Sequence, residues 1–147
     1  QHYESKRALF LAIIDHVGDR MIEVLTAATS GLTDGQAQVE AGMIAFFKWV
    51  ERDRNAFKFL FDSGTQNDEE FTIAIRKVLD RSAEAIAPLI AIDLDPIHVR
   101  TLAHGVAGAS EGVARFLINN TTAFNGEQIG KQIANLLWAG LRGVDSE

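Results

Sequence analysis

The sequence has 147 residues, 47% of them hydrophobic and 23% charged, with a formal net charge of −6, which is the composition of one globular domain and excludes a disordered chain. It contains no cysteine, which excludes disulfides, thiolate metal sites and cysteine nucleophiles and fits a reducing, cytoplasmic location. No apolar run approaches the roughly 20 residues that a membrane-spanning helix needs, and the acidic balance gives no sign that this stretch binds nucleic acid by itself.

Helical spacing dominates the first part of the chain, where apolar residues recur three and four positions apart and nowhere alternate strictly. The first helix is expected over 5–28, with Ser5 as its N-cap and Gly31 as the break that follows it. Thr33 and Gln36 have the spacing of a capping box. They predict the start of a second amphipathic helix.

Two further helices are expected before residue 90. A short helix with an aromatic inward face lies between the polar residues 53–55 and a loop over 63–68. Asn67 and Glu70 open the next helix in a cap pattern. Pro88 should kink or end that helix, because proline lacks the N–H that bonds back one turn.

The last two helices differ from the others. Asp95 followed by Pro96 opens the fifth, and Asn125 opens the sixth, which should end near Gly143. The fifth helix has an expected core face of Val99, Leu102, Val106, Val113 and Phe116. Beside this face runs a stripe of small residues, namely Gly105, Gly108 and Gly112. The chain as a whole is therefore predicted to form an all-α bundle of about six helices.

Apolar residues cover half or more of the circumference of the sixth helix, which is typical of burial on two sides. Ile129, Ile133, Leu136 and Leu137 form one face, and Ala134, Trp138 and Leu141 lie towards the other. Because glycine costs about 1 kcal/mol in a helix relative to alanine, the stripe on the fifth helix indicates close approach of another backbone. Packing within the chain and a two-fold interface both explain it, and we favour the interface. Its expected residues are Gly105, Gly108, Gly112, Ala134, Trp138 and Leu141.

Signals for catalysis are poor, and we expect no enzyme activity, no cofactor and no metal. The histidines are His2, His16, His98 and His104, with no pair four apart on one helix and no HExxH or EF-hand motif. Asp95 and His98 have the spacing seen in di-iron bundles, which need a second such motif and further glutamates. A haem-binding globin suits the length, but nothing singles out a haem ligand. Glu111 and Arg115 form an i,i+4 pair, expected in solvent or in a dimer contact.

Aromatic residues are concentrated in the middle of the chain. Six of the nine phenylalanines lie between Phe46 and Phe71, with Trp49 among them. Such a cluster is either plain core or the wall of an apolar ligand site, and the residues alone leave both open.

The segment His2-Tyr3-Glu4-Ser5-Lys6-Arg7-Ala8-Leu9-Phe10 resembles the junction that closes the DNA-binding domain of TetR/AcrR-family bacterial regulators. Two later segments are also similar in order: Trp49-Val50-Glu51 leading to Phe57 and Phe61-Asp62, and the final run from Leu136 to Gly143. The resemblance covers essentially the whole chain as a pattern, although only the junction motif is fairly specific.

The resemblance implies a ligand-sensing and dimerising domain over 5–147, with residues 1–4 as the tail of a DNA-recognition helix. Most of the helix-turn-helix would then lie outside this sequence, and Tyr3 and Lys6 would touch the DNA backbone. The expected partners are a second copy of the chain, duplex DNA bound through the missing N-terminal domain and a small hydrophobic effector. The expected action is that of a repressor released from DNA by the effector.

The family resemblance also places a ligand cavity between the middle helices. Its expected lining is Phe46, Phe47, Val50, Phe57, Phe61, Phe71, Ile75, Ser82 and Leu102. No group of lysines or arginines is expected there, so a neutral or weakly charged hydrophobic ligand is predicted. The alternative function is a stand-alone helical scaffold or lipid-binding domain with no role on DNA.

Overall fold

The computed structural model describes residues 2–65, 68–90 and 93–144. These ranges form six α-helices, one 3-10 turn and no strand, which confirms the predicted all-α fold. The elements are α1 (His2–Thr29), α2 (Gly35–Arg52), α3 (Arg54–Thr65), α4 (Glu69–Ile86), the 3-10 turn η1 (Ala87–Leu89), α5 (Pro96–Asn120) and α6 (Gly126–Leu141). No helix in these ranges is long and apolar enough to span a membrane.

Most helix boundaries follow the expected local signals. Gly31 adopts φ of 80° after α1, a left-handed conformation that glycine enters at no steric cost. Asp95 caps α5 with Pro96 in its first turn, and the side chain of Asn125 accepts a hydrogen bond from the Gln128 N–H at the start of α6. Regular α4 ends before Pro88, which lies in η1. These starts and stops are therefore readable from the sequence.

Three expected caps were wrong. Asp34, not Thr33, caps α2, because its carboxylate accepts the Ala37 N–H. Asp68 caps α4 through the N–H groups of Glu70 and Phe71, while Asn67 lies outside the described residues. Ser5 is no cap, because α1 is already helical from His2 and no glycine or proline interrupts it there.

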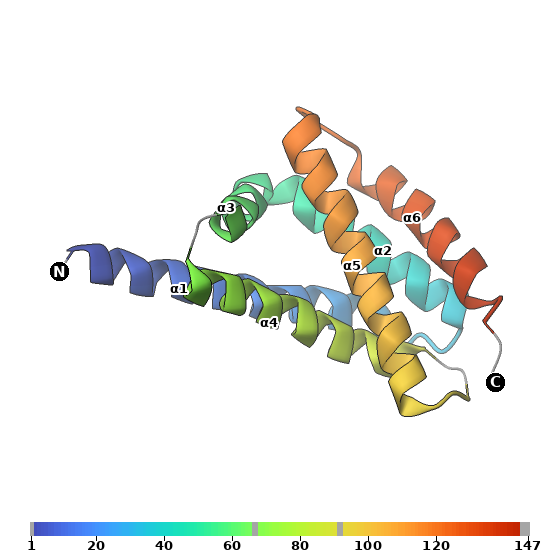
Figure 1. Ribbon diagram of the computed structural model, residues 1–147. Coiled ribbons are helices and arrows are strands. Elements are labelled where there is room, and N and C mark those ends of the chain that lie inside the picture. Colours follow the sequence, from blue (N-terminus) through green and yellow to red (C-terminus); the bar gives the residue numbers. More distant parts are fainter. Residues whose placement is uncertain (1, 66–67, 91–92, 145–147) are drawn as a thin grey trace.

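The helices form two pairs with α3 and α5 around them (Figure 1). One pair is α1 and α4, which run side by side in the same direction, and the first turns of α1 extend beyond the rest of the bundle. The other is α2 and α6, which share the most extensive helix–helix contact in the molecule. The main core lies between these pairs, and its largest fully buried side chains are Trp49, Phe47, Phe57, Ile14 and Val50.

The core face of α5 is rotated from the predicted one. Phe116, expected inside, is 60% exposed, and Val99, Leu102 and Val113 are only half-buried. The buried residues are mostly small, namely Ala103, Val106, Ala107, Ser110, Ala114, Leu117 and Ile118. Ala103 and Ala107 pack against Ala83 of α4, where short side chains allow close approach of the two helices.

The inner face of α6 is also small. Gly126, Gly130 and Ala134 are buried, each four residues after the last, against α2. Ile129, Ile133, Leu137 and Leu141 are half-buried beside them. Leu136, expected on the same face, is 65% exposed. Part of the wide apolar arc of α6 therefore packs against α2, and the rest lies on the surface.

Candidate ligand site

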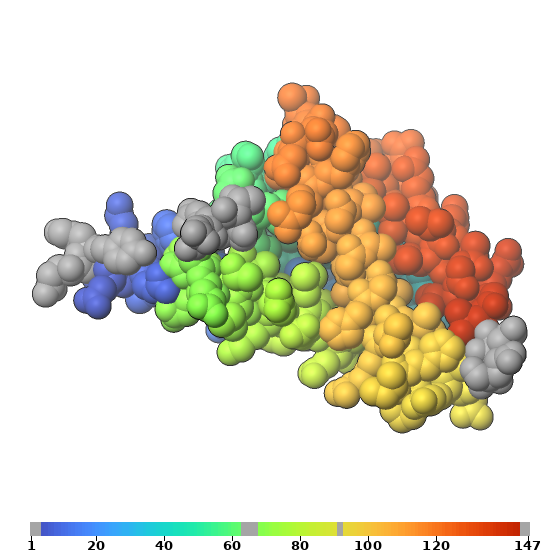
Figure 2. Space-filling view, viewed as in Figure 1, coloured from blue at the N-terminus to red at the C-terminus, as the bar shows by residue number. Residues whose placement is uncertain are grey.

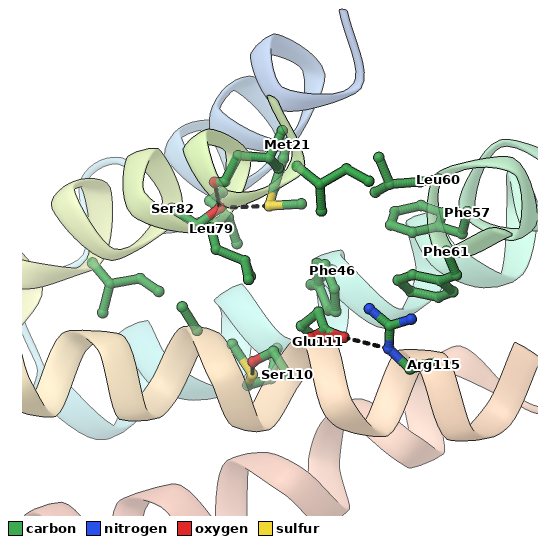
Figure 3. Close-up of a pocket in the computed structure, with 16 residues that line it drawn as sticks. Met21, Phe46, Phe57, Leu60, Phe61, Leu79, Ser82, Ser110, Glu111 and Arg115 are labelled. Atoms are coloured by element: carbon green, nitrogen blue, oxygen red, sulfur yellow. Dashed lines mark hydrogen bonds and ion pairs between the residues drawn. The ribbon is translucent and has the colours of Figure 1, made fainter. Parts of the chain in front are cut away.

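An apolar cavity lies between five of the helices (Figure 3). Two methionines, three aromatic rings, six aliphatic side chains and Ala107 form most of its wall, and the polar groups among its described lining residues are Ser82, Ser110, Glu111 and Arg115. The described lining residues are Met21 and Leu25 of α1, Met43 and Phe46 of α2, Phe57, Leu60 and Phe61 of α3, Ile75, Val78, Leu79, Ser82 and Ile86 of α4, and Ala107, Ser110, Glu111 and Arg115 of α5.

Part of the predicted lining reaches this cavity. Phe46, Phe57, Phe61, Ile75 and Ser82 line it. Phe47 and Val50 are fully buried in the core, and Leu102 is half-buried on α5; none of the three lines the cavity. Phe71 is buried elsewhere, with its ring centroid 5.9 Å from that of Phe10. Periodicity identified an inward face on each helix, but not which inward residues border empty space.

Sequence reasoning missed the contribution of α1 and of the second half of α5. Met21 and Leu25 follow the apolar spacing of the first helix, but nothing local in the sequence shows that they face a cavity. Ser110, Glu111 and Arg115 follow from the rotation of α5, which turns the smaller side of this helix towards the core. Glu111 and Arg115, expected in solvent or at a dimer contact, are therefore cavity residues.

Each of the two serine hydroxyls at the cavity donates its single proton to an acceptor within the chain. Ser82 Oγ lies 2.9 Å from the Val78 carbonyl oxygen and 2.7 Å from Met21 Sδ, and Ser110 Oγ lies 2.9 Å from the Val106 carbonyl oxygen. A hydroxyl has one proton to donate, so both groups face the cavity as acceptors. They can receive a hydrogen bond from a ligand but cannot give one without breaking an internal bond.

Glu111 and Arg115 form the charged part of the wall. Arg115 Nε donates to Glu111 Oε2 at 2.9 Å, and the guanidinium carbon lies 4.6 Å from the centre of the Phe61 ring. The two side chains are 26% and 39% exposed, so the pair borders solvent as well as the cavity. In Figure 3, Arg115 rises from α5 towards Phe61, while Ser82 and Met21 lie on the opposite wall.

The cavity is narrow as it stands. Its empty space is about 600 Å³ including the part open to solvent, of which about 40 Å³ is accessible to the centre of a water molecule. A second, wider cavity shares Leu25, Met43 and Ile86 with the first, and about 390 Å³ of it can be reached by the centre of a water molecule. Because Met21, Met43 and Arg115 are long and flexible, the first cavity can widen by side-chain movement.

Comparison with known proteins identifies the fold. Residues 36–140 match the family model described as "Tetracyclin repressor-like, C-terminal domain". The chain belongs to this TetR-like family. It is also 24% identical over 146 residues to the HTH-type transcriptional activator FasR of Mycolicibacterium smegmatis (strain ATCC 700084 / mc(2)155), an alignment that covers 98% of this chain and 67% of the relative. The family expected from the junction motif is thus confirmed.

Arg7 connects the junction motif of this TetR-like chain to the start of α4. Its guanidinium pairs with Asp68, the cap of α4, and with Glu70, and it lies 5.4 Å from the centre of the Phe71 ring. The hydrogen bond from Arg7 holds the pKa of the Asp68 carboxyl below its ordinary value, and the same contacts raise the pKa of Arg7. Phe10 extends the contact towards α3, since its ring centroid is 5.0 Å from that of Phe59.

The other predicted site residues occupy varied positions. Lys6 is exposed on α1, and the side chain of Tyr3 lies outside the described residues. Gly105, Gly108 and Gly112 are exposed, and a Cβ built on any of them meets nothing within 4 Å. Trp138 is half-buried against Gly35, Leu141 borders the second cavity, and Ala134 is buried within the chain. No cluster of three potential metal ligands occurs in the described ranges.

Proposed function

We propose that this chain is the effector-binding and dimerisation domain of a TetR-type transcriptional regulator. The observation that carries the proposal is the apolar cavity, because five helices converge on it and one of them, α1, also carries the junction motif. A ligand between α1, α4 and α5 changes the packing of the helix that would lead to the DNA-reading part.

Arg7 is the proposed link between ligand and DNA. It fastens the first turns of α1 to the N-terminal cap of α4, while α4 supplies Ile75, Val78, Leu79, Ser82 and Ile86 to the cavity wall. Arg81 makes a second link, at 2.5 Å from Asp19. A shift of α4 on ligand binding would therefore be passed to α1. Two such domains in a dimer would then change the spacing of their DNA-reading heads.

The proposed dimer uses the outward faces of α5 and α6. These consecutive helices both contribute to the surface seen in Figure 2. Among the described residues, a Cβ built on Gly105, Gly108 or Gly112 meets nothing within 4 Å. Phe116 and Leu136 leave large apolar surfaces in solvent. Trp138 and Leu141 would flank the interface, whereas Ala134 is already enclosed by its own protomer and has no surface for a partner.

DNA recognition is proposed for the longer protein and not for this stretch. With a net charge of −6, these 147 residues should not bind duplex DNA at physiological salt. The longer protein should bind a palindromic site in the cytoplasm, with Tyr3 and Lys6 on the DNA backbone. Repression relieved by the effector stays our prediction, and because the relative FasR is named an activator, transcription from the bound promoter in vitro must measure the sign.

A thermal-shift screen tests the cavity. Neutral hydrophobic amides, ketones and alcohols should include compounds that raise the melting temperature by several degrees, since a ligand at 100 times its Kd stabilises a fold by about 2.7 kcal/mol. Ile75→Phe should abolish the shift by filling the cavity, whereas Ile73→Phe, half-exposed on the same helix, should retain it. If no compound stabilises the unmutated chain, the sensor assignment fails.

A further inference from the structure

We infer that the ligand cavity takes a hydrophobic molecule with a single carboxylate, and that Arg115 is the group that binds the carboxylate. This rests on the proposed ligand-sensing function and adds to it the chemistry of the polar end. The geometry that carries it is the guanidinium of Arg115, held on two sides at the edge of an otherwise apolar cavity.

Two contacts hold the Arg115 side chain in place but do not use all of its N–H donors. Its Nε donates to Glu111 at 2.9 Å, and its guanidinium carbon lies over the Phe61 ring, 4.6 Å from the ring centre. Among the described residues, neither terminal nitrogen has a hydrogen-bond acceptor. Arginine presents five N–H donors in a planar fork, and a carboxylate matches that fork with two parallel hydrogen bonds. The contacts present fix the fork while leaving its outer donors for a ligand.

Among the described lining residues, Arg115 is the position that can bind an anion. Arg115 is the one cation among the described lining residues, and Ser82 and Ser110 donate their only protons within the chain. A buried carboxylate needs donors, so Arg115 is the position where a carboxylate head can be satisfied. The apolar walls from Met21, Leu79, Phe46 and Phe57 then receive the hydrophobic body.

A cationic ligand fits this arrangement less well. To use Glu111 and the face of Phe61, it would have to displace Arg115 from both contacts. An anion adds to the existing arrangement and displaces nothing. Glu111 is therefore a positioning residue, which holds Arg115 through Nε, and the pair distinguishes ligands by the sign of one charge.

The test compares matched head groups on the 147-residue chain. The probes are 4-phenylbutyrate, 6-phenylhexanoate and 8-phenyloctanoate, each with its primary amide and its amine, titrated by calorimetry. The carboxylate should bind at least about tenfold more tightly than the amide of the same length, the difference expected for charge-assisted hydrogen bonds. Arg115→Gln should remove this preference and leave the affinity for the amide unchanged, and Arg115→Lys should keep part of it.

A matched control separates the site from general charge. Lys131 pairs with Glu127 at 3.3 Å in the same i,i+4 arrangement on α6, away from the cavity, so Lys131→Gln changes the net charge equally and should keep the preference for carboxylates. Melting temperatures should be close for all variants, because ion pairs that border solvent, as both of these do, contribute little to stability.

Each outcome has a distinct meaning. Equal affinity for carboxylate and amide, or a preference that persists in Arg115→Gln, overturns the role of Arg115 and leaves the cavity standing. Tightest binding of the amine, lost in Glu111→Gln, shows that the cavity selects cations and overturns the inference. Failure of every probe, neutral amides included, overturns the ligand site itself.

Discussion

The two sets of glycines on the last helices look alike in the sequence and do opposite things in the structure. At Gly126 and Gly130 of α6, a Cβ would lie 2.6 Å from the Phe47 carbonyl oxygen and 2.5 Å from Ile44 Cα of α2. At Gly105, Gly108 and Gly112 of α5, it would meet nothing within 4 Å. Glycine is therefore required at the two α6 positions, because α2 lies too close for a side chain. At the three α5 positions, nothing within the described protomer explains why glycine is present.

The two glycine sets distinguish the helix pair that packs most closely within the protomer from a helix face that the described residues leave uncovered. The α2–α6 contact is closed by backbone proximity and by Glu51, whose Oε1 accepts the Gly126 N–H at 2.8 Å. The open face of α5 has the exposed Phe116 one turn beyond Gly112, and α6 has Leu136. Glycine without an intrachain reason next to exposed apolar side chains is what a helix–helix interface between protomers requires.

The largest effect is expected for Gly130→Ala. The added methyl group meets the backbone of Ile44, which cannot rotate away as a side chain can, so the two helices must separate. We expect a loss of about 3 kcal/mol in the free energy of unfolding, measured by urea denaturation. Retention of full stability would show that α2 and α6 are not in close contact and would remove the distinction between the two glycine sets.

Leu136→Glu should act on assembly and not on the protomer. Light scattering of the unmutated chain at micromolar concentration should give twice 16.1 kDa. A glutamate at this 65%-exposed position costs the protomer little, but it would be buried without a partner in the dimer, so the dissociation constant should rise at least about tenfold. Ile73→Glu, on half-exposed α4 surface, is the control and should remain a dimer. A monomeric unmutated chain would contradict the proposed interface.

A moderate effect is expected from Glu51→Ala. Removing the acceptor of the Gly126 N–H leaves the first turn of α6 without its tie to α2, and we expect a loss of about 1 kcal/mol in unfolding free energy. Glu127→Ala removes a carboxylate from the same turn of α6, where it is exposed and paired with Lys131, and should change stability much less. Equal losses in the two variants would mean that the turn responds to charge alone.

The smallest effect on the protomer is expected for Gly108→Ala, and it has the opposite sign. In the monomeric Leu136→Glu background, alanine should raise the free energy of unfolding by about 0.5–1 kcal/mol, because it restricts the unfolded chain and meets no clash. In the unmutated background it should weaken the dimer if a partner helix packs on this face. Stabilisation in both backgrounds would place the interface elsewhere.

Local sequence signals determined the number of helices, most of their ends and the family. Gly31, Asp95 with Pro96, Asn125 and Pro88 act through their own backbone geometry or through bonds within one turn, so their roles do not depend on the rest of the fold. The expected cap Thr33 was displaced by a single residue, to Asp34, since neighbouring polar residues compete for the same N–H groups. The family could be recognised from the sequence because the resemblance is carried by short contiguous segments, the most specific of them over residues 2–10.

The tertiary structure alone decided which face of each helix borders the cavity, the partner helix or the solvent. The rotation of α5 exposed Phe116 and brought Glu111 and Arg115 to the cavity, because alanines on its other side pack against α4. Phe47 and Phe57 are both fully buried phenylalanines, yet only Phe57 lines the cavity. Helical periodicity reports burial around one axis, whereas a cavity is the space left between five axes, and that space depends on how all five pack together.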